Sequence, residues 1–481
     1  MKRARLVLIL AALAACAAGR TQPFPEPPVA GPPRDAVLAR FEEVRLPNGL
    51  RVVVAQRAGI ALVTAHLLVL AGSEFDPPDR AGLAALTANL LTKGTRTRAA
   101  PALALAAETL GGSLNASAGC HASAVSMTVS SSRIEPALAL ITEVFTQPVF
   151  AAAELERARR LTLAGLRVAY AEPGSVAQIA ATRALFGAGA YGHPDDGTPA
   201  SLARITRADL RRLHALLYRP DEAVLVLAGD ITPETGLALA RRYLGDWRAP
   251  AAPLPRWPLL QGAPLAAPVI AVDLPGASQA SVVVTLPGIA RDAPDYVAGQ
   301  VANALLGGDY SSRLNQEIRI RRGLSYGASS SLAARRGGGQ IVLSAQTENA
   351  AATQVLELMR AELARVAEAA PADDELQARK ATLIGKLSRS VETTEGLAQR
   401  LAQLAIGGVP LAQIDGMVAA VAQVTPDQVQ QFARAHWRSP ALRVAVAGDA
   451  KEFGATLRQA EPALVTIPIR AFDPGQARLL K

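Results

Sequence analysis

The chain has 481 residues, of which 50% are hydrophobic and 19% are charged. Because a single hydrophobic core stops growing at about 250–300 residues, this length predicts two domains. The formal net charge of +9 includes Lys2, Arg3 and Arg5, and no run of basic residues interleaved with aromatic residues occurs, so nucleic-acid binding is not expected.

Residues 1–16 have the pattern of a bacterial lipoprotein signal peptide. A short basic region precedes an apolar run over residues 6–15, which is too short to span a bilayer as a mature helix. The sequence Leu13-Ala14-Ala15-Cys16 resembles a lipobox, which predicts lipidation of Cys16. Ordinary leader cleavage near the same small residues is the alternative.

The next segment, residues 17–37, is rich in proline and has no apolar period, so we expect an extended tether. Ala17 carries no acidic retention signal, which predicts a periplasmic protein anchored to the outer membrane. The second cysteine, Cys120, has no cysteine left to pair with if Cys16 is lipidated. We interpret Cys120 and His121 as packing residues of an alternating strand rather than as metal ligands.

Residues 38–247 alternate predicted strands and helices and form the expected first domain. An Asn48-Gly49 turn predicts a hairpin over residues 45–55, and Lys93-Gly94-Thr95 ends the helix that follows the next strand. The other expected strands are 61–71, two within 113–130, and 223–227, and the expected helices are 81–91, 101–111, 134–145, 154–168 and 201–218.

Residues 248–268 contain six prolines and are interpreted as a linker. Residues 269–475 then repeat the order of the first half. Ala228-Gly229-Asp230 recurs as Ala447-Gly448-Asp449, and a matching helix recurs at a similar distance of about 220 residues. The pattern predicts a duplicated α+β domain, each copy a mostly antiparallel sheet with helices packed on one face.

The stretch 307–327, GGDYSSRLNQEIRIRRGLSYG, carries the candidate site. Arg319 and Tyr326 stand seven residues apart across a predicted helix-to-strand break at Gly323. A guanidinium and a phenol are suited to binding a peptide carbonyl and stabilising an oxyanion. The alternative is a solvated charge on a helix and an aromatic residue on a strand.

The strings SSRLNQEIR and GLSYG within this stretch resemble the second-half signature of the pitrilysin/insulinase class of zinc peptidases, particularly its mitochondrial-processing-peptidase-like bacterial branch. The resemblance implies two homologous domains of that kind. It also implies that Arg319 and Tyr326 bind the substrate carbonyl opposite the zinc.

Active members of that class have the form G-L-x-H-x-x-E-H followed by K-G-T, which places two imidazoles and a catalytic glutamate on one helix. Here Gly82, Leu83 and Lys93-Gly94-Thr95 match, but the three chemical positions hold Ala85, Ala88 and Asn89. The later glutamate ligand is also missing from residues 163–166. The resemblance therefore predicts a member that holds no zinc.

The other histidines do not replace the lost ligands, because no two of them are separated by one helical turn. The five are His66, His121, His193, His214 and His436.

In this branch, two-domain chains can pair so that one chain supplies the zinc motif and the other the Arg/Tyr pair. The resemblance thus implies a metal-free subunit of a heterodimeric metallopeptidase, with Arg319 and Tyr326 acting in trans on an unfolded peptide and zinc held by the partner. One alternative is a catalytically inert peptide-binding or structural subunit of an envelope complex. A further alternative is a hydrolase that uses Ser311 or Ser325, although neither has a recognisable His/acid arrangement.

Overall fold

The computed structural model describes residues 40–254, 260–476 and 478–480. The predicted signal peptide, Cys16 and the predicted tether 17–37 lie outside the described residues, as does part of the predicted linker. The chain divides into the units Met1–Asp35 and Ala36–Lys481, and everything below concerns the second unit. No helix in the described part of the chain combines the length and the apolar character needed to cross a membrane.

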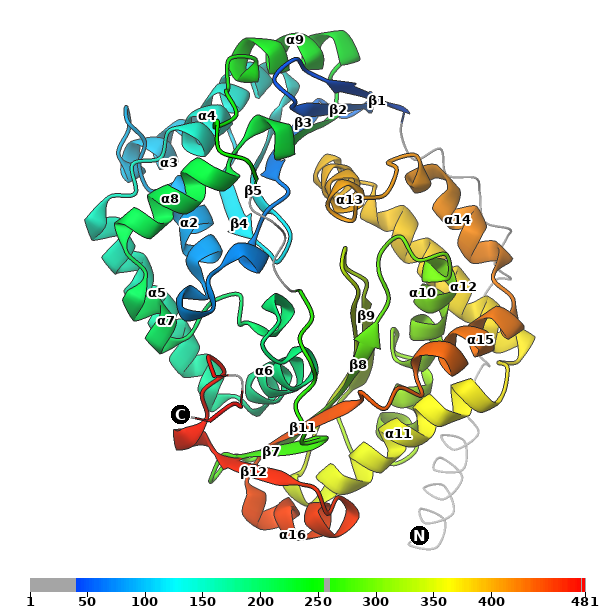
Figure 1. Ribbon diagram of the computed structural model, residues 1–481. Helices are drawn as coiled ribbons and strands as arrows, with labels where there is room; N and C mark the ends of the chain where they lie inside the picture. Colours follow the sequence, from blue (N-terminus) through cyan, green and yellow to red (C-terminus); the bar gives the residue numbers. More distant parts are fainter. Residues whose placement is uncertain (1–39, 255–259, 477, 481) are drawn as a thin grey trace, which may run out of the picture. The chain divides into compact units, whose positions relative to one another are not determined.

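Two six-stranded sheets form the framework, in the orders β1-β2-β6-β3-β5-β4 and β12-β7-β11-β8-β10-β9 (Figure 1). Most neighbouring strands are antiparallel, and the parallel pairs are β2 with β6, β11 with β7 and β12 with β7. The strands are β1 (Arg40–Arg45), β2 (Arg51–Gln56), β3 (Leu62–Val69), β4 (Asn115–Ala118), β5 (Ser123–Ser130), β6 (Ala223–Gly229), β7 (Val269–Asp273), β8 (Ala280–Gly288), β9 (Ala328–Ala333), β10 (Gly339–Thr347), β11 (Arg443–Gly448) and β12 (Val465–Pro468).

The two sheets repeat one topology. The order β2-β6-β3-β5-β4 of the first sheet is matched by β7-β11-β8-β10-β9 in the second, and only the outermost strands β1 and β12 differ. The predicted duplication and the α+β class are thus confirmed. The repeat also places β4 and β9 at corresponding sheet edges.

Fifteen described α-helices surround the sheets. Those before the second sheet are α2 (Leu83–Leu91), α3 (Ala100–Thr109), α4 (Ile134–Thr146), α5 (Ala152–Ala171), α6 (Pro173–Phe186), α7 (Pro199–Arg204), α8 (Arg207–Leu217) and α9 (Pro233–Leu244). Those after its first strand are α10 (Tyr296–Leu306), α11 (Ala352–Glu368), α12 (Asp373–Ser390), α13 (Thr394–Ile406), α14 (Gln413–Gln423), α15 (Pro426–His436) and α16 (Ala450–Ala460).

Each sheet buries one face against helices of its own half. Alternate residues of β2 and β3, such as Val52, Val54 and Leu67, enter one core with helices α2, α4, α5 and α8. The second sheet forms the equivalent core with α10, α11 and α15. This arrangement follows from the period-two alternation of strand side chains.

The opposite face of each sheet is covered by a helix from the other half of the chain. Helix α13 packs on β3 and β6, and its Leu397 and Leu401 join Val53 and Val226 in one buried cluster. Helix α6 packs on β8 and β11 with a face of small residues that includes Ala177. Burial on both faces explains why β6 is apolar at every position, and the sequence pattern alone did not predict this exchange.

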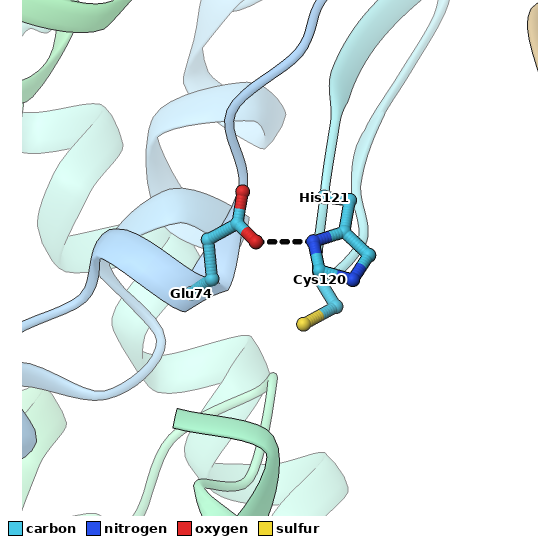
Figure 2. Close-up of side chains that lie close together, drawn as sticks. All are labelled: Glu74, Cys120 and His121. Carbon is cyan, nitrogen blue, oxygen red and sulfur yellow. Dashed lines mark hydrogen bonds and ion pairs between the residues drawn. The ribbon is translucent and has the colours of Figure 1, made fainter. Parts of the chain in front are cut away.

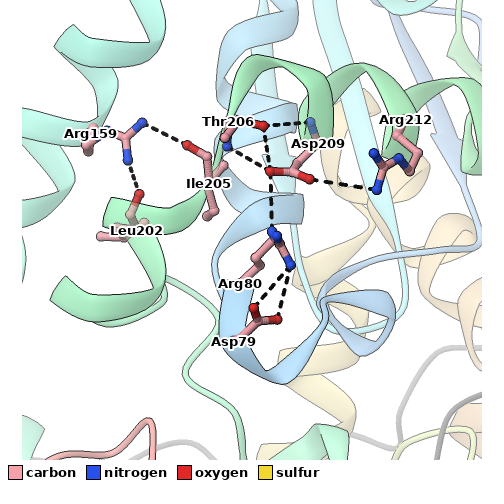
Figure 3. Close-up of polar contacts among 8 residues, drawn as sticks. All are labelled: Asp79, Arg80, Arg159, Leu202, Ile205, Thr206, Asp209 and Arg212. Atoms are coloured by element: carbon pink, nitrogen blue, oxygen red, sulfur yellow. Dashed lines mark hydrogen bonds and ion pairs between the residues drawn. The ribbon is translucent and has the colours of Figure 1, made fainter.

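The predicted single helix over residues 201–218 is in fact two helices, α7 and α8. The chain is extended at Ile205 and Thr206, where Thr206 and Asp209 form a reciprocal capping box that starts α8. Arg159 of α5 donates to the carbonyls of Leu202 and Ile205 at the end of α7 (Figure 3). The capping box and the hydrogen bonds from Arg159 therefore divide the segment into two helices, although its apolar residues recur with a helical period throughout.

The same cap connects to the loop before α2. Arg80 Nε lies 3.3 Å from Asp209 Oδ2, and Arg212 flanks the same carboxylate (Figure 3). Burial would raise the pKa of Asp209, but the hydrogen bonds from Thr206 and the charges of Arg80 and Arg212 outweigh burial and lower it.

His214 of α8 is half-buried and packs against Phe150 and Tyr218, two residues of the first core. Its Nε2–H donates to the Phe145 carbonyl over 2.8 Å, and its ring stacks on Tyr218 with 4.5 Å between centroids. Burial lowers the pKa of His214 from 6.5 to about 4, because the apolar surroundings disfavour the imidazolium.

Truncation of the exchanged helix should destabilise the fold strongly. Leu401 is fully buried between α13 and the first sheet, so Leu401→Ala is expected to lower the free energy of unfolding by about 2–5 kcal/mol. Leu105 on α3 is 64% exposed, so Leu105→Ala is the matched control, with a change of about 0.5 kcal/mol or less. Urea unfolding measures both, and equal effects would contradict the buried α13 interface.

Acid should destabilise the first half through His214. Its folded pKa lies below the unfolded value, so its contribution is complete above about pH 6.5 and is lost as the pH falls toward 4. Relative to wild type, His214→Gln should flatten the decline in unfolding free energy over this window by about 1–3 kcal/mol. Thermal unfolding at a series of pH values tests this, and an unchanged slope would refute it.

Candidate functional site

Arg319 lies in η6 (Asn315–Ile320), a one-turn π-helix at the edge of the second sheet. The π-helix ends at Ile320, and three residues later Gly323 has a φ of 64°, which is left-handed and suits glycine. The chain then reverses, so that Tyr326 returns beside Arg319 just before β9 begins. Isolated π-helical turns are frequent at functional sites, because they redirect one side chain.

The Arg319 guanidinium lies between two tyrosine rings. Its Cζ is 4.7 Å from the ring centroid of Tyr310 and 4.9 Å from that of Tyr326. Tyr326 is 90% exposed and Tyr310 is 57% exposed. Tyr310, Arg319 and Tyr326, called the Arg319 group below, therefore face solvent. Within the described part of the chain, Arg319 forms no ion pair, and its N–H groups remain available for a ligand.

Neighbouring arginines differ from Arg319 because they share a counter-ion. Glu317 accepts from Arg321 over 2.9 Å and also from Arg322. Burial would raise the pKa of Glu317, but these two arginines outweigh burial and lower it. Of these three arginines, Arg319 is the one whose charge is not paired with a carboxylate among the described residues.

Tyr310 lies in a loop that β9 and α12 hold in place. A side-chain carbon on Gly307 would lie 2.4 Å from the backbone nitrogen of Ser330, so only glycine permits this approach to β9. From α12, Lys386 Nζ donates to the Gly308 carbonyl over 2.8 Å, which holds the start of the loop. The sequence analysis gave Tyr310 no role, since nothing in its spacing showed that its ring would meet Arg319.

Helix α2 presents no metal-ligand set. Ala88 is fully buried, Ala85 is half-buried and Asn89 is exposed. Helix α5 packs against α2, yet residues 163–166 on α5 read Leu-Ala-Gly-Leu. The helices meet, but neither an imidazole nor a carboxylate occupies these positions.

Cys120 and His121 lie in the connection between β4 and β5, so their predicted placement within a strand was wrong. Both are held against Glu74, which the sequence analysis did not single out because it lies 46 residues before Cys120. The other histidines are not members of this group: His193 lines a cavity with Cys120, and His436 pairs with Asp295 over 2.7 Å.

Neither serine proposed as an alternative nucleophile has a base beside it. Ser311 Oγ accepts from Arg379 over 2.7 Å, and Ser325 Oγ donates to the Gly327 carbonyl over 2.7 Å. These contacts engage both hydroxyls without a histidine or a carboxylate, and a serine nucleophile needs such a group to take its proton. The geometry therefore does not favour a serine hydrolase.

Two protein-family descriptions match the chain, and both agree with the geometry described above. The description Insulinase (Peptidase family M16) matches residues 51–194, and Peptidase M16 inactive domain matches residues 204–383. The chain belongs to peptidase family M16. The two matches follow one another along the chain, as its duplicated M16 architecture requires.

Individual relatives agree with the M16 assignment. An uncharacterized zinc protease of Streptomyces coelicolor is 29% identical over 407 residues, covering 83% of this chain and 88% of that one. A probable mitochondrial-processing peptidase subunit beta of Schizosaccharomyces pombe is 26% identical over 280 residues, covering 56% and 59%. The crystal structure of a peptidase M16 inactive domain from Pseudomonas fluorescens superposes with a TM-score of 0.79 at 27% identity, covering 85% of this chain and 98% of that chain.

Proposed function

We propose that this M16 chain is the non-zinc-binding subunit of a heterodimeric metallopeptidase. One observation carries the proposal: Arg319, without a counter-ion, is held between two exposed tyrosines, while α2 lacks the residues that would bind zinc. A charged side chain held in place and open to solvent is suited to binding a ligand. The relatives' names as zinc proteases support a role in peptide hydrolysis.

Arg319 and Tyr326 would act on the scissile carbonyl. The N–H groups of the guanidinium would donate to the carbonyl oxygen. The Tyr326 hydroxyl would add a second donor, and both bonds would strengthen as negative charge develops on that oxygen. Because the two tyrosine rings hold the guanidinium in place, less side-chain entropy is lost on binding.

A zinc ion in the partner subunit would supply the activated water that attacks this carbonyl. The residues of this chain would orient the peptide rather than generate the nucleophile. A partner with an intact H-x-x-E-H sequence is therefore a requirement of the proposal.

The substrate would be an unfolded peptide bound as an added strand. Both β4 and β9 end their sheets, and on β9 the amides of Ala328 and Ser330 already donate to Asn315 Oδ1 and to the Gly307 carbonyl, so β4 has the more open edge. Exposed edges accept extended peptides through main-chain hydrogen bonds. Helix α2 packs on β4, and η6 contacts β9. A peptide bound along β4 would therefore lie beside Ala85, Ala88 and Asn89, and one bound along β9 would lie beside Arg319.

A catalytically inert peptide-binding or structural subunit of a cell-envelope complex is the second candidate function. The same exposed edges and the same Arg319 group support it, because binding of a peptide needs no metal. The two functions differ in whether a zinc-bearing partner chain is needed.

Peptidase activity on an unfolded peptide distinguishes the two functions. The chain alone should be inactive, and a mixture with a co-encoded homologue that carries H-x-x-E-H should be active. In the mixture, Arg319→Ala and Tyr326→Phe should each lower the rate by about 100-fold or more, because each removes an oxyanion donor.

The matched control for this assay is Arg321→Ala. Arg321 is exposed and its partner Glu317 keeps Arg322, so the control rate should stay within about twofold of the parent. Inactivity with every such homologue, or an active Arg319→Ala mixture, would refute the catalytic role and leave the inert subunit.

The location of the chain is also a proposal. Lipidation of Cys16 would anchor it to the outer membrane with the M16 domains in the periplasm. Cys16→Ala should move the protein from the outer-membrane fraction to the soluble periplasmic fraction or block its processing. An unchanged membrane fraction would contradict the lipid anchor.

A further inference from the structure

Three different ligand types meet in the first half of the chain. Glu74 lies in η1 (Ser73–Phe75), and Cys120 and His121 lie in the connection between β4 and β5 (Figure 2). A carboxylate oxygen, the thiol sulfur and an imidazole nitrogen all lie within 4.8 Å of one another. Among the described residues, no other group of three or more such side chains comes as close.

The backbone brings these side chains together. The amide of Ser73 donates to the Gly119 carbonyl over 3.0 Å, and that of Glu74 donates to the Cys120 carbonyl over 3.1 Å. A side-chain carbon on Gly72 would lie 2.0 Å from the Gly119 oxygen, so glycine is required for this approach. The positions of the three ligands are therefore set by main-chain pairing as well as by their side-chain contacts.

A second layer of contacts orients the ligands. Tyr191 Oη lies 2.8 Å from His121 Nε2, which leaves Nδ1 directed at Glu74. Arg336 Nη2 lies 3.0 Å from Glu74 Oε1 and 3.4 Å from His121 Nδ1, while the other carboxylate oxygen faces the imidazole. An ion at His121 Nδ1 would replace the contacts of that nitrogen with Glu74 and Arg336, while Tyr191 holds Nε2, which is the usual arrangement around a metal-binding histidine.

We propose that Glu74, Cys120 and His121 bind one divalent transition-metal ion of the zinc class. Thiolate, imidazole and carboxylate together favour zinc over magnesium or calcium, which prefer oxygen ligands alone. The site uses none of the α2 positions at which the family motif is lost.

Burial of the site matches this assignment. The side chain of Glu74 has no exposed surface and that of His121 is 6% exposed. A cavity of about 180 Å³ lined by Cys120, His193 and Asp195 lies beside the thiol.

Cobalt titration tests the site directly. The full chain carrying Cys16→Ser retains Cys120 as its only thiol, so a thiolate-to-cobalt charge-transfer band can come from no other residue. After treatment with a chelator, we expect one Co²⁺ per chain, with this band and the visible bands of a tetrahedral ion. Added Zn²⁺ should displace the cobalt and remove both features.

Variants assign the ligands. Cys120→Ser should abolish the charge-transfer band, and Glu74→Gln and His121→Gln should weaken cobalt binding by at least about tenfold. Tyr191→Phe should weaken it by about tenfold, because the imidazole loses its orienting partner. His66→Gln is the control, since His66 lies on β3 and is not part of the group, and it should bind cobalt as the parent does.

Failure of the parent to show the charge-transfer band would overturn the proposal, as would a band that survives Cys120→Ser. Glu74 and His121 would then be members only of the ion-pair network with Arg336. Because the readout is metal binding and not peptide hydrolysis, the result is independent of the function proposed above.

Discussion

Burial of both faces of both sheets is the constraint on which the rest of the structure depends. Each half supplies one helix, α6 or α13, to the sheet of the other half, so neither sheet is complete without the opposite half. A buried hydrogen bond of 2.9 Å between the hydroxyls of Thr64 and Thr394 adds a polar contact where α13 begins. The exchange makes the duplicated chain one structural unit, and β4 and β9 are edge strands on corresponding sides of the two sheets.

The chemistry of the chain is concentrated at those edges and is divided unequally between the halves. At the first edge, α2 presents neither an imidazole nor a carboxylate at Ala85, Ala88 and Asn89. At the second edge, Arg319 keeps its full charge, its exposure and two aromatic neighbours. The Arg319 group depends on a π-helix, a glycine turn and a loop held by α12.

Local chemistry decided which features could be predicted from the sequence. The Asn48-Gly49 turn and the spacing of Arg319 and Tyr326 could be predicted because each depends on residues close together in the chain. The internal repeat could be predicted because its two copies have similar amino-acid sequences. The cover of the first sheet by α13 could not be predicted, because an apolar helical face shows that a helix is buried and not which sheet it contacts. The approach of Tyr310 to Arg319 depends on how the loop and the π-helix fold back on each other. The approach of Glu74 to His121 depends on main-chain hydrogen bonds between distant segments. A single sequence reveals neither.

The central claim is that the Arg319 group binds a peptide in a chain that carries no family metal site. The most direct measurement is fluorescence anisotropy of a labelled unfolded peptide titrated with the chain alone, without any partner. The account predicts saturable binding that Arg319→Ala weakens by about tenfold or more, because charge-assisted hydrogen bonds contribute about 1.5–3 kcal/mol. The absence of binding, or equal affinity for the parent and Arg319→Ala, would contradict it.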